Sequence, residues 1–139
     1  MNVENQVHPE PDQVQEFVAT EGPVCMVNLL RFKEKAEYPD GRDAHLSGRE
    51  AYMRYATEMK KLVEGSGGRF VFGAEVQGAL LGRIDDLWDQ VGIVEYPSSK
   101  ALIQISMSPE FQAIEVHRGA GLAGQLNLTT TEVPFGDGA

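Results

Sequence analysis

Apolar residues recur along the chain with two spacings, and the alternation between these spacings predicts the order of its elements. Spacings of three and four residues place side chains on one face of a helix and predict helices over about 10–20, 48–64, about 99–105 and 109 to about 118. The helix over 48–64 has the clearest signals, because Ser47 and Glu50 have the spacing of a capping box and Gly65 supplies a stop.

Continuous or alternating apolar residues predict strands between these helices. Residues 24–32 are almost uniformly apolar, as in a strand covered on both faces, whereas residues 69–81 alternate between apolar and polar positions. Further strands are predicted over 88–96 and over 125–133, the latter rich in threonine. Residues 33–46 are charged and contain a Tyr-Pro-Asp-Gly turn, which predicts a long surface loop.

After the first helix, the predicted order is strand, helix, strand, strand, helix, strand. This is the split βαβ arrangement of an α+β, ferredoxin-like βαββαβ protomer, in which both helices cover one face of an antiparallel sheet. The strands around Val27 and Val91 carry apolar residues at both parities, so the second face of the sheet would be an exposed apolar patch in a single chain. We therefore predict a homodimer that packs sheet against sheet.

Composition narrows the class of protein. The chain has 139 residues, 42% of them hydrophobic, and a formal net charge of -9. We expect an N-terminal tail with a short helix over 1–22, one domain over 23–134 and a flexible C-terminal tail over 135–139. The negative charge disfavours nucleic acid and anionic membrane surfaces as partners, and the lack of an export signal or a long apolar run predicts a soluble, cytoplasmic protein.

The sequence lacks several motifs that would identify a chemistry. It has no glycine-rich nucleotide-binding motif, no H-E-x-x-H zinc motif and no G-x-S-x-G nucleophile elbow. Its one cysteine, Cys25, cannot form an internal disulfide, and a metal site would need two of three scattered histidines to converge. We therefore expect neither a metal nor a cofactor.

His117 and Arg118 are the first candidates for chemistry. Both project along the edge of the buried face of the helix over 109–118, where an imidazole could act as a general base and a guanidinium could hold an anion. In the alternative interpretation, His117 bonds a backbone carbonyl, while Arg118 pairs with a carboxylate and covers apolar surface with its stem.

Asn28, Arg31 and Tyr55 are candidates for ligand contacts. Asn28 and Arg31 interrupt an apolar strand, so each either lines a polar pocket or is paired by a neighbouring segment. Tyr55 lies on the inward stripe of its helix, where it is either a core residue or directs its hydroxyl into a cleft between helix and sheet.

Glu95 is the carboxylate that we expect to be buried, because its strand neighbours Val91, Ile93 and Val94 are apolar. If it is desolvated, its raised pKa would suit a general base. If it pairs with Arg31, Arg69 or Arg118, it forms a structural ion pair, and we favour this interpretation.

Three short motifs carry a resemblance to a known family. They are Gly67-Gly68-Arg69-Phe70 after the long helix, Val94-Glu95-Tyr96-Pro97-Ser98 before the next one, and Ser108-Pro109-Glu110-Phe111-Gln112 followed by Arg118. In this order, over about residues 24–133, they resemble the domain-of-unknown-function 1330 family within the dimeric α+β barrel superfamily. The resemblance implies a ferredoxin-like protomer paired into a barrel. The superfamily includes cofactor-free monooxygenases, lactone isomerases, dehalogenase-like and haem enzymes, so the fold does not select a chemistry.

The leading hypothesis is a dimeric protein that binds a small, partly apolar organic molecule, with an anion as one possibility, between helices and sheet. As an enzyme it would use cofactor-free acid–base chemistry, with His117 as the base. Arg118 or Arg31 would hold a carboxylate or enolate, and Asn28 or Tyr55 would supply a hydrogen bond. Two alternatives stay open: a non-enzymatic ligand-binding or structural dimer, and a haem protein with His117 as axial ligand.

Overall fold

The computed structural model describes residues 4 and 6–134, which form four helices and a four-stranded antiparallel sheet. The elements are α1 (Pro11–Val18), β1 (Val24–Phe32), α2 (Gly48–Gly65), β2 (Arg69–Glu75), β3 (Gln90–Tyr96), α3 (Ser99–Ser106), α4 (Pro109–Gly121) and β4 (Leu122–Thr130). Their order confirms the predicted α+β, ferredoxin-like fold. The tail predicted over 135–139 lies outside the described residues. Within the described part of the chain, no helix combines the length and apolar character needed to cross a membrane.

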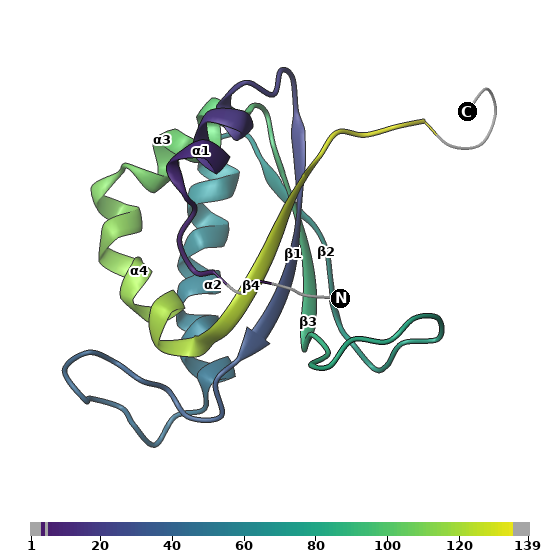
Figure 1. Ribbon diagram of the computed structural model, residues 1–139. Coiled ribbons are helices and arrows are strands. Elements are labelled where there is room, and N and C mark those ends of the chain that lie inside the picture. The colour runs from purple at the N-terminus through teal and green to yellow at the C-terminus, as the bar shows by residue number, and fades with distance from the viewer. Residues whose placement is uncertain (1–3, 5, 135–139) are drawn as a thin grey trace.

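β1 lies inside the sheet, whose order is β2-β3-β1-β4. It pairs antiparallel with β3, from Val24↔Tyr96 to Leu30↔Gln90, and with β4 on its other side. Its apolar residues occupy both faces of the sheet: Met26 and Leu30 are buried under the helix layer, whereas Val27 lies on the other face, which no described helix covers. Figure 1 shows the helices gathered on one face of the sheet, as right-handed crossovers require.

The two long helices of this layer start at capping residues and meet at glycines. The Ser47 side chain accepts from the Glu50 amide at 3.0 Å and the Glu50 carboxylate accepts from the Ser47 amide at 2.9 Å, which confirms the capping box of α2. Where α2 and α4 meet, a Cβ on Gly121 would lie 2.4 Å from the carbonyl oxygen of Gly48. Only glycine allows the two backbones to approach this closely.

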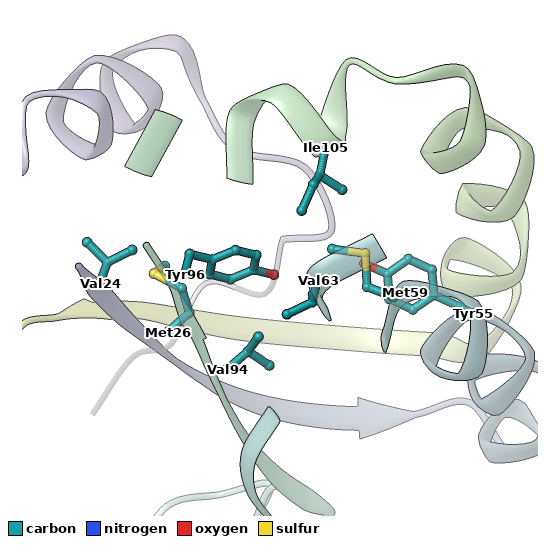
Figure 2. Close-up of a cluster of buried hydrophobic side chains, with 8 residues drawn as sticks. All are labelled: Val24, Met26, Tyr55, Met59, Val63, Val94, Tyr96 and Ile105. Atoms are coloured by element: carbon teal, nitrogen blue, oxygen red, sulfur yellow. The ribbon is translucent and has the colours of Figure 1, made fainter. Parts of the chain in front are cut away.

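The main core lies between the sheet, α2 and α3. Figure 2 shows its side chains, which come from both layers and are at most 8% exposed: Val24, Met26, Val94 and Tyr96 from the strands, Tyr55, Met59 and Val63 from α2, and Ile105 from α3. Burial of this apolar area is what attaches the helix layer to the sheet.

β2 is shorter than the strand predicted over 69–81, and β3 begins later than predicted. Beyond Glu75, the amide of Val76 still donates to the carbonyl of Asp89, but β3 starts at Gln90 and offers no partner farther along. The apolar residues that continued the pattern lie in a loop, where Leu80 is 97% exposed. A strand ends where its pairing partner ends, whatever its own periodicity.

The last helix and the last strand meet without a linker. α4 continues to Gly121 instead of ending at about 118, and β4 covers 122–130 instead of 125–133. The Lys33 amide donates to the Gly121 carbonyl at 2.8 Å and Leu122 pairs with Phe32, so contact with β1 turns the chain directly from helix to strand. β4 ends at Thr130 because this residue already pairs near the start of β1.

The sheet face opposite the helices carries an apolar row. Phe72, Ile93, Val27 and Leu128 lie side by side across the four strands in the pairing register. Phe72 and Leu128 are 56% and 44% exposed. No described helix covers this face (Figure 1), so its apolar surface is the patch that the sequence predicted.

Candidate functional site

A cavity of about 780 Å³ lies between the helix layer and the sheet. α2 packs closely along α4, and both helices contribute side chains to the wall of the cavity above the sheet. Every helix and strand contributes to its wall, and the apolar part includes Phe17, Met26, Leu30, Met59, Leu102 and Phe111. Small-molecule sites in proteins typically enclose about 300–1,000 Å³. The cavity is therefore the candidate binding site.

Two linked amides and a guanidinium, which we call the cavity relay, cross one wall of this cavity. Asn28 Nδ2 donates to the carbonyl oxygen of Gly92 at 3.2 Å, and Asn28 Oδ1 accepts from Gln125 Nε2 at 2.7 Å. Gln125 Oε1 accepts from Arg118 Nη2 at 2.7 Å. A backbone carbonyl at one end and a guanidinium at the other allow each amide only one orientation.

Arg118 keeps most of its hydrogen-bonding capacity. It lies half-buried in the last turn of α4 and lines the cavity. Gln125 accepts from one of the five N–H groups of a guanidinium, and no carboxylate of a described residue lies within 4.0 Å of it. The carboxylate partner considered for Arg118 is therefore absent from the described part of the chain.

Three tyrosines line the same space. Tyr52 and Tyr55 on α2 and Tyr96 on β3 line the cavity, and none of their hydroxyls bonds to a described residue. No unpartnered side-chain oxygen or nitrogen among the described buried groups is sealed from solvent, so these hydroxyls reach the open space. In Figure 2 the hydroxyl of Tyr96 points into the space between the strands and α2.

These phenols are protonated at neutral pH, and burial raises their pKa further above the ordinary value of 10.0. It raises the pKa of Tyr55 to about 12, an effect that the charge of Arg118 opposes. It also raises the pKa of Tyr52 and of Tyr96. The cavity therefore presents the Arg118 guanidinium and three neutral phenols, which suit a ligand with acceptor oxygens, and its wall also contains His8 and the carboxylate of Glu115.

His117 lies in a different place, in a cluster that we call the loop clamp: Tyr38, Asp43, Arg54 and His117. His117 Nδ1 lies 2.7 Å from Tyr38 Oη, which also accepts from Arg54 at 3.2 Å, and Arg54 contacts Asp43 at 2.9 Å. Burial lowers the pKa of His117, as do the nearby Arg54 and Arg42. His117 does not line the cavity.

Glu95 and Arg31 also lie away from the cavity, on the opposite parity of their strands. Arg69 Nε contacts Glu95 Oε1 at 3.1 Å, which confirms the ion pair favoured for this carboxylate. Arg31 donates to the carbonyl of Asp86 and lies 5.1 Å from the centre of the Trp88 ring, so it holds the loop before β3.

The structure thus brings together Asn28, Tyr55 and Arg118 of the predicted residues and adds others that the sequence did not indicate. One feature of the sequence could have indicated Gln125, because it is a polar residue on the strand parity that faces the helices. His8 and Glu115, whose side chains approach to 3.6 Å at the cavity wall, had no signal because they are far apart in the sequence. No group of three metal-ligating side chains gathers among the described residues.

Comparison with solved structures identifies close relatives of the fold. A protein of unknown function from Rhodopseudomonas palustris matches with a TM-score of 0.84 and 29% identity, over 94% of this chain and 99% of that chain. The methylated form of that protein matches with a TM-score of 0.85 and 31% identity, over 97% and 98%. SnoaB, a cofactor-independent oxygenase from Streptomyces nogalater, shares the fold alone, with a TM-score of 0.52 and 14% identity over 83% and 97%. None of the curated proteins matches the chain.

One family model matches residues 42–130, which is more than half of the chain. This range begins before α2 and ends with β4, and it contains the three motifs that carried the resemblance. The chain therefore belongs to the family described as Domain of unknown function (DUF1330).

Proposed function

We propose that this protein binds a small organic anion in the cavity between helices and sheet, and that Arg118 holds the anionic group. The proposal is carried by one observation: a guanidinium with unused donors lines a mostly apolar cavity and has no carboxylate partner among the described residues. A charge in such surroundings is stabilised when an opposite charge and good hydrogen bonds accompany it.

A carboxylate on an apolar body fits this site best. The guanidinium fork can donate two parallel hydrogen bonds to a carboxylate, and the apolar wall can cover the rest of the molecule. The free phenol hydroxyls of Tyr52, Tyr55 and Tyr96 offer donors to further oxygens.

The same donors would support cofactor-free chemistry on such a ligand, since Arg118 and Tyr55 could stabilise an enolate oxygen. A base would also have to reach the cavity. Glu115 lines it and His117 does not, so Glu115 takes the place of His117 as the candidate base. Binding is the function proposed here, and catalysis would be an extension of it.

The test uses two probes of the same shape, 2-naphthoate and the neutral 2-naphthamide, measured by isothermal titration calorimetry. We expect the carboxylate to bind about tenfold more tightly than the amide, and we expect Arg118→Met to abolish this preference. Arg83→Met removes the same charge from an exposed position outside the cavity and should change neither affinity. Equal affinity of the two probes for the wild-type protein would disprove the anion site.

We also propose that two copies pair through the helix-free sheet face, where Phe72 and Leu128 lie in one apolar row. Light scattering at micromolar concentration should give twice the mass of the chain. Phe72→Glu combined with Leu128→Glu should give a monomer, whereas Leu80→Glu, on the exposed loop, should not. A monomeric wild-type protein would exclude the pairing.

A further inference from the structure

The segment Gln6–Val18, which we call the N-terminal segment, forms one wall of the cavity. Val7, Pro9, Val14 and Phe17 line it from this side. In Figure 1 the segment leads into α1 and lies beside α4 and β4. It precedes the residues 42–130 that the family model covers, so the family match says nothing about this wall.

The N-terminal segment is connected to the rest of the site at two points near its start. Gln6 forms an isolated antiparallel bridge with Gln125, which is the middle residue of the cavity relay. His8 Nδ1 lies 3.6 Å from Glu115 Oε1 on α4. The side chains of His8 and Glu115 are 71% and 38% exposed, so their contact is weakened by solvent.

The other end of the segment has firmer attachments. The buried Ser99 hydroxyl contacts the carbonyl oxygens of Thr20 and Val18 at 3.2 and 3.5 Å. Gly22 follows with a φ of +78°, a conformation that favours glycine. One end of the segment is thus anchored beside a glycine turn, while the other end is held by exposed contacts.

α1 has few attachments to the rest of the fold. It buries no residue completely, and its N-terminus is capped from within the segment, because the Glu10 amide donates to Gln13 Oε1 at 2.8 Å. Displacing the segment would therefore uncover the partly buried Phe17 but no fully buried residue of α1.

A second hollow of about 490 Å³ lies outside this wall. Val7, His8, Glu115 and Arg118 line both the hollow and the cavity, so they form the partition between the two spaces. Arg118 can thus be reached from both spaces, and the contact of His8 with Glu115 lies beside it in the partition.

From these observations we propose that the N-terminal segment is a hinged lid over the ligand site, latched by His8 with Glu115 and by Gln6 with Gln125, and that ligands enter beneath it. The identity of the cavity as a ligand site rests on the proposed function. The motion of the lid does not, because opening can be measured without a ligand.

The first experiment measures opening by thiol labelling in a Cys25→Ala background. Ser106→Cys places a nearly isosteric thiol on the cavity wall, and Lys60→Cys places one on an exposed position of α2. With iodoacetamide, we expect the wall thiol to react much more slowly than the exposed thiol. We expect His8→Ala to speed labelling of the wall thiol by about fivefold or more, and His45→Ala, an exposed histidine elsewhere, to leave it unchanged.

Two results would overturn the lid. One is a wall thiol that reacts as fast as the exposed thiol in the intact protein, and the other is a labelling rate that His8→Ala leaves unchanged. If Ser106→Cys fails to fold, Ala56→Cys on the α2 wall provides the same measurement.

The second experiment follows 2-naphthoate binding by stopped-flow fluorescence. With a lid, His8→Ala should raise both the association and the dissociation rate constants by about fivefold. Binding with rates that His8→Ala does not alter would refute the lid and leave the proposed function intact. A wild-type protein that does not bind 2-naphthoate would refute the proposed function, while thiol labelling would still decide the lid.

Discussion

His117 and Arg118 are consecutive residues of α4, yet they belong to polar clusters of opposite character. In the loop clamp, His117, Tyr38, Arg54 and Asp43 contact one another, and Tyr38 is 4% exposed. At the cavity, Gln125 occupies one donor of Arg118, and three phenol hydroxyls have no partner among the described residues.

The two clusters differ in how far their polar groups are paired with one another. In the loop clamp, hydrogen bonds and burial attach residues 33–46 to the helices, and this attachment stabilises the fold. At the cavity relay, a few hydrogen bonds fix the direction of Arg118 and leave its other donors available. These unused donors beside the cavity are the feature on which the proposed binding site rests.

The largest expected effect is a loss of stability when the loop clamp is disrupted. Tyr38→Ala removes a buried aromatic side chain and should lower the free energy of unfolding by about 3 kcal/mol, as measured by urea denaturation. The affinity of the folded variant for 2-naphthoate should stay within about twofold of wild type, because Tyr38 does not line the cavity. A large loss of affinity with little loss of stability would reverse the roles of the two clusters.

Breaking the cavity relay should lower both the stability of the protein and its affinity for the ligand. Gln125→Leu removes the contact that orients Arg118 and leaves Asn28 Oδ1 without its partner, so stability should fall by about 1 kcal/mol. Affinity for 2-naphthoate should fall by about fivefold in calorimetry. Asn127→Leu is the matched control, since Asn127 also lines the cavity from β4 but takes no part in the relay. Equal losses for the two variants would argue against orientation by the relay.

The pH dependence of stability should come from the clamp. Burial and nearby arginines lower the pKa of His117 below its ordinary 6.5, so the unfolded chain binds this proton more readily than the folded chain. The stabilisation from neutral His117 is full above about pH 6.5 and is lost as the pH falls through the folded pKa. Urea denaturation between pH 5 and 7 should show a flatter profile for His117→Gln, whereas His45→Gln should keep the wild-type slope.

The smallest expected effect is the difference in stability between losing the hydroxyl of Tyr38 and losing that of Tyr55. Tyr38→Phe removes a bonded hydroxyl and should cost about 1 kcal/mol, whereas Tyr55→Phe removes an unpartnered one and should change stability by no more than about 0.5 kcal/mol. Thermal unfolding of the two variants makes the comparison. Equal destabilisation would mean that the hydroxyl of Tyr55 is also used structurally.

Local signals in the sequence predicted which helices and strands form more accurately than they predicted where each one ends. The capping box placed the start of α2, and the continuous apolar run placed β1 at 24–32. The ends of β2 and β4 were wrong because a strand ends where its neighbour stops pairing, and that position is set by residues far away in the chain.

The residues of the candidate site also divide into those that a local signal predicted and those that it did not. Asn28, Tyr55 and Arg118 were found because a polar residue on an inward-facing stripe is visible in the sequence. The setting of His117 could not be found, because its partner Tyr38 is 79 residues away in a loop without periodicity.

The sequence by itself determined the order of the elements, the faces that turn inward and therefore the ferredoxin-like fold, because periodicity and capping are local properties of the chain. Only the tertiary structure decided which polar groups are paired. His117 and Arg118 are adjacent on α4, but Tyr38 of the loop contacts His117, whereas Arg118 lines the cavity. Partners and empty volume depend on contacts between distant segments, which no local pattern records.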